Sequence, residues 1–387
     1  MGHRAAVVGA GHTRFGAVPE GPRALLRSAM DQALASVDRG LERSSIDRGY
    51  LATLGFGGWQ LGNASAVLAE ELRVPGLPTV RVENACASGG FAVHEAVRAV
   101  SSGDCELVVV AGLEKMTDVS AARRRYWLGV SGDTEWERQA GLTFAGVYGL
   151  IASQYLARYG VPAAALAEVA VKNHENGALN PNAHFQKRIT REQALASPKV
   201  ADPLGLFDCC PVSDGAAAVV IASPEHARKL TDTPVYVDGI GAASDFLAVQ
   251  ERPDLLGFAA SRKAADEAFR AAGCGPRDVS LLEAHDCFTI AELLAIEDLG
   301  FAARGAAAEL TLSGATRRDG RVPVNPDGGL KAKGHPIGAT GVSQVYEVFL
   351  QLRGSAAARQ VPHATRAVAH NVGGAGATAA VTVLGVG

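Results

Sequence analysis

The segment from Val80 to Leu113 constrains the fold more than any other part of the sequence. Val80–Glu83 alternates valines with charged residues, and Ser88–Val100 repeats apolar residues at helical spacing. Leu107–Ala111 is a short apolar run of the kind that forms buried strands. The segment therefore predicts a strand, a sharp turn, a helix and a second strand, which is a unit of an α/β fold.

Cys86 lies at the turn where the first of these strands ends and the helix begins. Free backbone N–H groups and the positive end of the helix dipole favour an anion there, so we expect them to lower the pKa of the thiol. The neighbouring residues are small and leave room for a substrate against the backbone: Ala85, Ala87, Ser88, Gly89 and Gly90. Taken alone, this turn fits a buried structural cysteine better than a nucleophile.

Composition narrows the class of protein. The 387 residues suffice for two ordinary domains or for two halves of a duplicated fold, and 48% hydrophobic residues with 20% charged residues are typical of a globular protein. A formal net charge of -3 gives no reason to expect nucleic acid or an anionic membrane as a partner. No apolar run reaches the roughly 18 residues of a membrane span, and Met1–Gly16 lacks the apolar core of a signal peptide. Six irregularly spaced cysteines do not indicate a disulfide framework, so we expect a cytoplasmic protein.

The order of predicted elements repeats along the chain. Ala5–Gly11 predicts a strand and Gly21–Val37 a helix, and later Val235–Gly241 and Ala259–Ala272 predict a second such pair. The glycines after the first strand do not meet the G-x-G-x-x-G spacing, so we reject a dinucleotide site. The repeat predicts two halves, each a mixed sheet covered by helices.

A segment without a counterpart separates the halves. We place it at residues 117–230, between an N-terminal half of residues 1–116 and a C-terminal half of residues 231–387. It contains a predicted helix at Leu150–Tyr159 and ends with a buried strand at Asp214–Ser223 that rejoins the core. An insertion over one face is a common place for substrate specificity. Our candidates for substrate contact in it are Arg123, Trp127, Phe144 and Tyr148.

Three further motifs place reactive residues at turns between strands and helices. The run E-A-H-D-C-F carries His285 and Cys287 at the end of a predicted strand, ahead of a helix at Thr289–Leu299. The run K-G-H-P-I-G-A-T-G surrounds His335 with glycines that permit a tight turn. The run H-N-V-G-G-A-G from His370 predicts a turn whose N–H groups can bind an oxyanion. Each motif alone has a structural explanation, but two thiols and several histidines at turns of a duplicated fold predict a catalytic site.

With these motifs the sequence resembles the thiolases, most closely the branch related to sterol carrier protein thiolases and their archaeal and bacterial relatives. The resemblance rests on N-A-C-A-S-G at Cys86, H-D-C-F at His285–Phe288, N-P-D-G-G and K-G-H-P-I-G-A-T-G between Asn325 and Gly341, and H-N-V-G-G from His370. It covers essentially the whole chain. It implies an α/β thiolase fold, in which two duplicated βαβαβαββ halves form a five-layered α-β-α-β-α core with an inserted loop domain.

The resemblance also implies an acetyl-CoA C-acyltransferase and the roles of four residues. Cys86 accepts an acyl group from an acyl-CoA as a thioester, and His335 deprotonates Cys86 and helps to hold the thioester oxygen. Cys287 removes or returns the α-proton of the second acyl-CoA, and His285 completes the oxyanion site for the enolate. A Claisen condensation needs such a base and two separate oxyanion sites.

The glycine-rich turn departs from the better-known thiolases, because Asn371 stands where they carry their second cysteine. We therefore assign the acid/base role to Cys287, and an oxyanion site to Asn371 and to the backbone N–H groups of Cys86 and Gly373. By the same resemblance, CoA and acyl-CoA are substrates, no cofactor is permanently bound and the chain forms at least a homodimer or homotetramer. No His/Cys set has the spacing of a metal site.

The resemblance leaves several properties open. Arg123 either contacts the phosphates of CoA or belongs to a solvated basic surface, and Trp127, Phe144 and Tyr148 are candidate walls that limit acyl length. The alternatives to a thiolase are a decarboxylating condensing enzyme, a transferase with a non-CoA acceptor, and a subunit that works only with a small OB-fold partner. The sequence leaves the acyl chain length and the physiological direction of the reaction undetermined.

Overall fold

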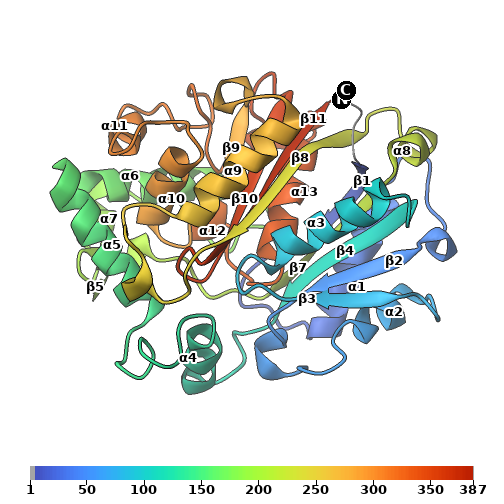
Figure 1. Cartoon of the computed structure of the whole chain (residues 1–387), viewed down its shortest axis with the longest axis horizontal. Coiled ribbons are helices and arrows are strands. Elements are labelled where there is room, and N and C mark those ends of the chain that lie inside the picture. Colours follow the sequence, from blue (N-terminus) through green and yellow to red (C-terminus); the bar gives the residue numbers. More distant parts are fainter. Residues whose placement is uncertain (1–4, 387) are drawn as a thin grey trace.

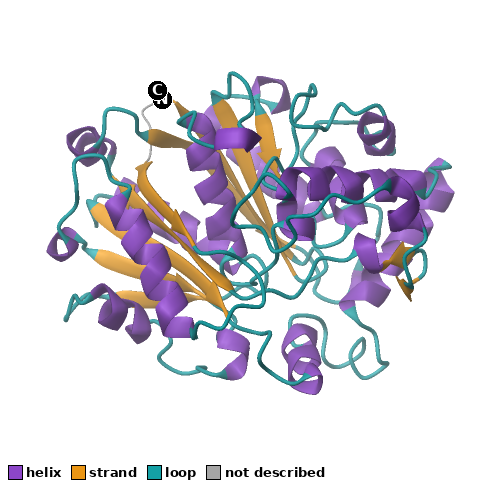
Figure 2. Cartoon of the chain, turned by 180° about the vertical axis from the view of Figure 1, so that it is seen from behind, coloured by secondary structure: helices purple, strands orange, loops and turns teal. Residues whose placement is uncertain are grey.

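Two half-sheets form the centre of the molecule (Figures 1 and 2). A computed structural model describes residues 5–386, so residues 1–4 and Gly387 lie outside the described part. The segment Met1–Gly16, considered above for a signal peptide, is therefore described only from Ala5 onward. Nine strands form one mixed sheet in the order β3-β2-β4-β7-β1-β8-β11-β10-β9. These strands are β1 (Ala5–His12), β2 (Arg48–Ala52), β3 (Thr79–Val82), β4 (Leu107–Glu114), β7 (Gly215–Ala222), β8 (Val235–Ser244), β9 (Leu281–Glu283), β10 (Arg366–Gly373) and β11 (Thr378–Val386).

The two half-sheets share one topology, which confirms the predicted duplication. The N-terminal half runs β3-β2-β4-β7-β1, and the C-terminal half runs β9-β10-β11-β8. The strands β9, β10, β11 and β8 correspond in turn to β2, β4, β7 and β1. In the first half β2 is parallel to β4 and β4 is antiparallel to β7, and in the second half β9, β10 and β11 are related in the same way. The counterpart of β3 is reduced to one bridge between Leu282 and Val324. The halves meet where Ala5–Val7 pairs with Val235–Val237.

Helices divide the molecule into five layers. The helices α1 and α2 cover the outer face of the N-terminal half-sheet, and α9 and α10 cover the outer face of the C-terminal half-sheet. The helices α3 and α13 lie between the half-sheets and pack against both. The helices of the two halves are α1 (Pro22–Ala35), α2 (Ala66–Leu72), α3 (Ser88–Ser101), α8 (Pro224–Leu230), α9 (Ala259–Ala272), α10 (Thr289–Asp298), α11 (Ala307–Leu312), α12 (Gly329–Ala332) and α13 (Thr340–Leu352). The predicted α-β-α-β-α core is confirmed.

The sequence of β4 shows why the layers form. Its side chains point alternately to opposite faces of the sheet. Val108 and Val110 pack in the central layer with α3 and α13, whereas Val109 and Ala111 pack in the outer layer with α1 and α2. Because both faces of the strand are covered, β4 reads as a continuous apolar run rather than an alternating one.

Glycines let the two central helices meet near their N-termini. A Cβ atom added at Gly89 would lie 2.8 Å from the amide nitrogen of Gly341, and one added at Gly341 would overlap the amide nitrogen of Gly90. The backbones of α3 and α13 therefore touch where a side chain would keep them apart. Since Cys86 precedes α3 and His335 precedes α13, this contact brings the two turns together, as the duplication predicts.

The segment between β4 and β7 packs mainly on the C-terminal half. It contains α4 (Ala121–Gly129), α5 (Phe144–Tyr159), α6 (Ala164–Gly177), α7 (Arg191–Leu195) and a small sheet of β5 (Lys199–Ala201) and β6 (Leu204–Gly205). Residues of α5 and α6 share one apolar cluster with α9 and α10. Figure 1 shows these helices to one side of the C-terminal half, and α4 apart from them.

Two predicted elements differ in extent from those in the structure. The helix predicted at Leu150–Tyr159 begins at Phe144, because the Thr143 hydroxyl accepts a hydrogen bond from the Gly146 amide and caps it. The strand predicted ahead of His285 is confined to Leu281–Glu283, because Pro276–Asp278 forms a single 3₁₀ turn before it. Among residues 5–386, none of the helices combines the length and the apolar character needed to cross a membrane.

Candidate active site

A tight turn presents Cys86 between β3 and α3. Ala85 adopts a left-handed conformation with φ of 47°, which is uncommon for a residue with a side chain. The Ser88 hydroxyl accepts a hydrogen bond from the Asn84 amide at 2.9 Å and donates one to the Ala85 carbonyl at 2.6 Å. A non-glycine residue in this conformation costs roughly 1–3 kcal/mol, which the surrounding contacts offset.

The structure corrects the expected acidity of Cys86. The thiol is partly buried against Leu54, Met116 and Ile337. This burial raises its pKa to about 12, and the nearby Cys210 adds to the rise, whereas the Gly374 amide opposes it. Desolvation outweighs the effect of the helix N-terminus on the pKa. The free energy needed to remove a thiolate from water exceeds the free energy gained from the nearby N–H groups. Cys86 therefore rests as a neutral thiol and needs a base.

The raised pKa of Cys86 determines how fast the thiol is alkylated at a given pH. In the free enzyme we expect the rate of alkylation of Cys86 by iodoacetamide to rise about tenfold per pH unit from pH 7 to 9.5, because the thiolate fraction rises in that proportion below the pKa. Mass spectrometry of the Cys86 peptide measures this rate. A plateau below pH 9 would contradict the raised pKa, and Cys86→Ser gives the background.

His335 offers a lone pair to this thiol. Its Nδ1 lies 2.7 Å from the Thr340 hydroxyl, which itself donates to the Pro336 carbonyl at 2.9 Å. The hydroxyl must therefore accept from His335, so the ring proton is on Nδ1 and the lone pair is on Nε2. Burial and the charge of Lys333 lower the pKa of His335 to about 3, which keeps the ring neutral. The residue is thus a neutral base.

His285 lies at right angles to His335. The ring centroids are 5.2 Å apart with an interplanar angle of 87°, and one ligating atom from each of Cys86, His285 and His335 lies within 4.8 Å of the others. The Nε2 atom of His285 is buried and has no hydrogen-bond partner among the described residues. Burial and the proximity of His335 lower the pKa of His285 well below its usual value. The structure thus brings together three residues that are up to 249 positions apart in the sequence (His335 − Cys86 = 249).

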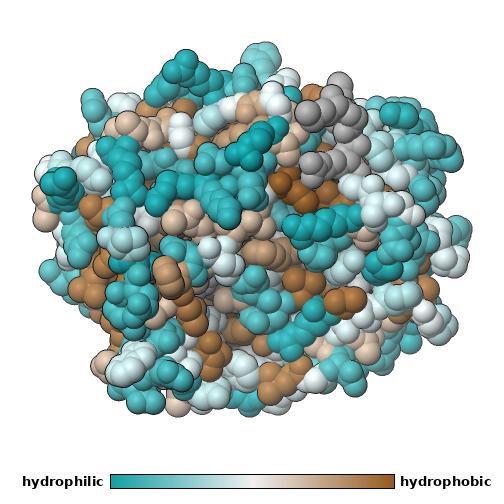
Figure 3. Space-filling view, viewed as in Figure 1, coloured by the Kyte–Doolittle hydropathy of each residue, from teal (hydrophilic) through white to brown (hydrophobic). Residues whose placement is uncertain are grey.

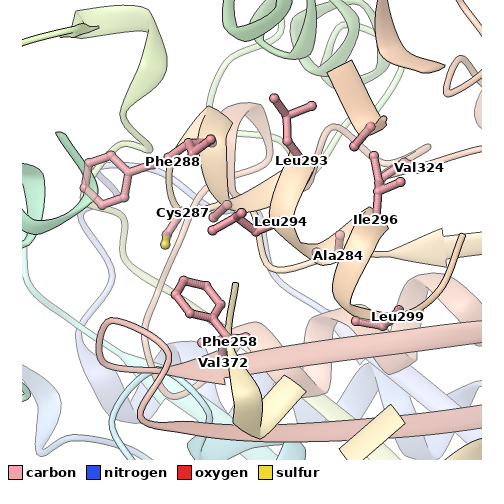
Figure 4. Packing of buried hydrophobic residues seen from close by; sticks show 14 of the residues in the cluster. Phe258, Ala284, Cys287, Phe288, Leu293, Leu294, Ile296, Leu299, Val324 and Val372 are labelled. Atoms are coloured by element: carbon pink, nitrogen blue, oxygen red, sulfur yellow. The ribbon is translucent and has the colours of Figure 1, made fainter. Parts of the chain in front are cut away.

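Cys287 lies on the turn between β9 and α10, at the edge of an apolar cluster. Figure 4 shows it between Phe288 and Phe258, with its sulfur turned away from Leu293. Burial raises the pKa of this thiol, and the neighbouring Tyr148 hydroxyl opposes part of the rise. Cys86 adds to the rise, which places the two thiols within electrostatic reach of each other. Both thiols are therefore protonated at rest.

Asp286 connects the Cys287 turn to the His335 loop. Its buried carboxylate accepts hydrogen bonds from the Leu330 amide at 2.6 Å and the Lys331 amide at 3.2 Å, and from the Asn173 side chain at 2.7 Å. Asp286 thus caps α12, the short helix just before His335. Only the tertiary structure shows this contact, because Asp286 and Leu330 are far apart in the sequence.

The candidate substrate residues lie at different depths. Tyr148 is fully buried, stacks on Phe288 with centroids 4.5 Å apart and lies beside Cys287. Trp127 packs against the same apolar residues as Cys86, and Phe144 is partly buried at the start of α5. Arg123 is exposed and donates to the Gly58 carbonyl at 2.6 Å. The structure thus brings Tyr148 and Trp127 to the thiols and leaves Arg123 at the surface.

The glycine-rich turn after β10 lies against the Cys86 turn. A Cβ added at Gly373 would lie 2.6 Å from the Asn84 carbonyl, so the two turns are in backbone contact. The amide that faces the Cys86 sulfur belongs to Gly374, one residue after the predicted Gly373. Asn371 donates to the Cys86 carbonyl at 2.9 Å and lies 3.2 Å from Nδ1 of His285. Asn371 therefore contacts two catalytic candidates.

A cavity of about 440 Å³ opens to solvent on the insertion side of the molecule. It is lined by Trp136, Glu137, Ala140, Gly141, Leu142, Val249 and Gln250. Trp136 is 71% exposed, and Figure 3 shows apolar side chains scattered among polar ones on one face of the molecule. The sequence did not predict this cavity, because its walls come from the insertion and from the loop after β8.

Comparisons with known proteins agree with the motifs. The model described as thiolase, N-terminal domain matches residues 5–225, and the model described as thiolase C-terminal domain-like matches residues 241–386. An acetyl-CoA acetyltransferase of Methanothermobacter thermautotrophicus is 43% identical over 381 residues, covering 98% of each chain. Sterol carrier protein 2 of Gallus gallus is 33% identical over 100% of this chain and 72% of its own length.

A solved structure is also similar over nearly its whole length. The Ltp2-ChsH2(DUF35) aldolase matches with a TM-score of 0.87 at 26% identity, covering 99% of this chain and 97% of the other.

Proposed function

The chain belongs to the thiolase family and is a thiolase-type acyltransferase, and we propose that Cys86 is its nucleophile. Its substrates are CoA thioesters. The observation that carries the assignment is the convergence of Cys86 with His285 and His335, whose ligating atoms lie within 4.8 Å of one another, beside the thiol of Cys287. The first half of the reaction is acyl transfer to Cys86, and the second is Claisen condensation with acetyl-CoA or, in reverse, thiolysis.

In the first half-reaction Cys86 attacks the thioester carbon of an acyl-CoA. Its proton moves to Nε2 of His335, the S–C bond to Cys86 forms, and the bond from the carbon to CoA sulfur breaks. The CoA thiolate takes the proton back from His335 and leaves as a thiol. In this proposal the backbone N–H groups of Cys86 and of Gly374, whose amide faces the Cys86 sulfur, hold the oxygen of the tetrahedral intermediate. The Cys86 thiol and the His335 imidazole are both neutral at rest, and the proton passes between them during the attack. The step therefore needs no preformed thiolate.

In the second half-reaction Cys287 acts as the base. Its thiol first gives its proton to Nε2 of His335, and the resulting thiolate removes an α-proton from acetyl-CoA while His285 donates a hydrogen bond to the enolate oxygen. The α-carbon attacks the Cys86 thioester, the new C–C bond forms and the bond to Cys86 sulfur breaks. The released Cys86 thiolate takes the proton held by His335, Cys287 keeps the α-proton as its thiol proton, and the product is a 3-ketoacyl-CoA. Thiolysis runs the same steps in reverse.

The intact mass of the protein after brief incubation with acetyl-CoA tests this assignment. We expect a gain of one acetyl group, mapped to the Cys86 peptide, and its loss in Cys86→Ser. Acetoacetyl-CoA with free CoA is then expected to be cleaved. If wild-type protein takes no acyl group from thioesters of several chain lengths, the nucleophile assignment is wrong.

Acyl chain length is expected to depend on the insertion, for which residues 117–230 remain our proposed unit between residues 1–116 and 231–387. Phe144 is partly buried at the start of α5, against the cluster that contains Cys287. We expect Phe144→Ala to shift the preferred acyl chain toward longer substrates by roughly tenfold in relative kcat/KM, since it removes a large side chain from the wall. A series of 3-ketoacyl-CoA thiolysis rates measures this, and an unchanged profile would contradict it.

The assembly of the protein is also a proposal. We propose a cytoplasmic homodimer, supported by the free edge of β3, which ends the sheet and exposes 47% of Val80. A small OB-fold partner is a further proposal, supported by the similarity to the Ltp2-ChsH2(DUF35) aldolase, whose name joins two components. Light scattering of the purified chain tests the dimer. Thiolysis with and without a partner encoded by a neighbouring gene tests the second proposal, and full activity alone would count against it.

A further inference from the structure

Asn371 sits between the two halves of the site. It is buried on β10, and each polar atom of its amide has a partner. Its Oδ1 accepts a hydrogen bond from the Gly90 amide at 3.0 Å, and its Nδ2 donates to the Cys86 carbonyl at 2.9 Å. The same Nδ2 lies 3.2 Å from Nδ1 of His285. A single side chain thus contacts the nucleophile turn and a catalytic histidine.

The backbone of the Cys86 turn fixes which way the amide faces. The Gly90 amide can only donate and the Cys86 carbonyl can only accept. Rotating the Asn371 amide by half a turn would place two donors against each other at Gly90 and two acceptors against each other at Cys86. Two independent contacts therefore agree that Nδ2 faces Cys86 and, with its second hydrogen, His285.

This orientation determines where His285 carries its proton. Because Asn371 Nδ2 is a donor, Nδ1 of His285 must accept, and a neutral imidazole that accepts at one nitrogen is protonated at the other. The ring is neutral, since burial and the neighbouring His335 disfavour the charged form. His285 therefore carries its hydrogen on Nε2, the atom that is buried without a partner among residues 5–386.

We propose that Asn371 is a positioning residue that sets the tautomer of His285, so that an N–H group and not a lone pair faces the substrate oxygen. This inference rests on the proposed function, in which His285 binds the enolate. The two histidines then have opposite tautomers: Thr340 leaves His335 with a lone pair on Nε2, and Asn371 leaves His285 with a hydrogen on Nε2. One ring accepts the Cys86 proton and the other donates to the oxygen.

The sequence placed Asn371 in an oxyanion site, but its contacts give it an indirect role. Both of its N–H groups are already engaged, one by Cys86 and one by His285, so it acts on the oxyanion through His285 and not directly. The contact between Asn371 and His285 also limits what the cluster of Cys86, His285 and His335 can bind. The lone pair of His285 is taken up by Asn371, so this ring offers no lone pair to a metal ion while the contact holds.

The test is Asn371→Asp, which keeps the shape of the side chain and turns the donor into an acceptor. We expect the proton of His285 to move to Nδ1, which reverses its ¹⁵N shifts in protein labelled at histidine, with His285→Gln identifying the signals. Exchange of the α-protons of acetyl-CoA with solvent is expected to fall about 100-fold or more, the typical cost of one oxyanion donor. Acetylation of Cys86 is measured beside it and is expected to fall by a smaller factor than α-proton exchange, because His335 is untouched whereas the Cys86 carbonyl loses its Asn371 donor.

Asn180→Asp is a matched control. Asn180 is also buried, donates to the Asp327 carbonyl at 2.9 Å and accepts from the Asn182 amide at 3.0 Å, and its side chain makes no hydrogen bond to a histidine within residues 5–386. We expect its His285 signals to match wild type. Asn371→Ala removes the donor without adding an acceptor and is expected to give a mixture of tautomers with an intermediate exchange rate.

The wild-type spectrum alone can overturn the inference. A hydrogen on Nδ1 of His285 in wild-type protein would do so, and so would an Asn371→Asp variant that keeps the hydrogen on Nε2. These readouts need no turnover. Failure of the proposed function, seen as a wild-type enzyme that takes no acetyl group on Cys86, is therefore distinguishable from failure of the tautomer assignment.

Discussion

Cys287→Ala is expected to take up an acetyl group on Cys86 at close to the wild-type rate and to fail in the second half-reaction. The physical reason is the division of labour between the two thiols. Acyl transfer needs Cys86 and the lone pair of His335, both of which the variant retains. Removal of the α-proton needs a base beside the substrate, and a positioned base typically contributes 10²- to 10⁴-fold, so we expect thiolysis and condensation to fall by about that factor.

Two measurements separate the half-reactions in Cys287→Ala. Intact mass after rapid mixing with acetyl-CoA follows the first, and exchange of acetyl-CoA α-protons with deuterated solvent follows the second. Cys86→Ser is the complementary variant, in which no acetyl group is taken up. A matched control is Cys274→Ala, since that thiol lies after α9 outside the site. Retention of α-proton exchange in Cys287→Ala would assign the base to another residue.

Gly341→Ala is expected to destabilise the whole protein and to abolish activity. An added Cβ would overlap the Gly90 amide nitrogen and the Asn371 side-chain oxygen, and the Gly90 nitrogen, which belongs to the backbone of α3, cannot move without separating α3 from α13. Overpacking of a well-packed core typically costs about 1–3 kcal/mol, and we expect the upper part of that range because the contact is with backbone. Alanine is worth about 1 kcal/mol more than glycine within a helix, which offsets only part of this cost.

Thermal unfolding and the acetylation assay measure the effect of Gly341→Ala. We expect a clear fall in Tm together with loss of Cys86 acetylation, since the same contact positions the Cys86 and His335 turns. Gly129→Ala is the control, because its added Cβ at the end of α4 would meet its nearest neighbour, Arg138, at an ordinary 3.6 Å. If both variants unfold and react like wild type, the glycine contact does not position the site.

The local pattern of the sequence was sufficient for much of the fold. The pattern of the apolar residues predicted α3 and β4 close to their observed bounds, because this pattern reports which face of an element is buried. The repeated order of elements predicted that the Cys86 and His335 turns are equivalent. The extent of α5 was predicted less well, since its N-terminus depends on a cap at Thr143 within a glycine-rich stretch.

Properties that depend on distant residues came only from the tertiary structure. The sequence placed Cys86 at a helix N-terminus and so predicted a lowered pKa, whereas the apolar contacts of Leu54, Met116 and Ile337 raise it. The hydrogen bond by which Asp286 caps α12 joins residues 44 positions apart, and the contact between Asn371 and His285 joins residues 86 positions apart.

The sequence by itself therefore determined the family, the order of the elements and the reactive residue types, because these follow from short-range periodicity and from motifs of adjacent residues. The tertiary structure decided the protonation of the thiols and the tautomers of the histidines. Desolvation and hydrogen-bond direction are set by whatever atoms surround a group in space. For Cys86 those atoms include Ile337 of the other half, and for His285 they belong to Asn371 on the neighbouring strand of its own half.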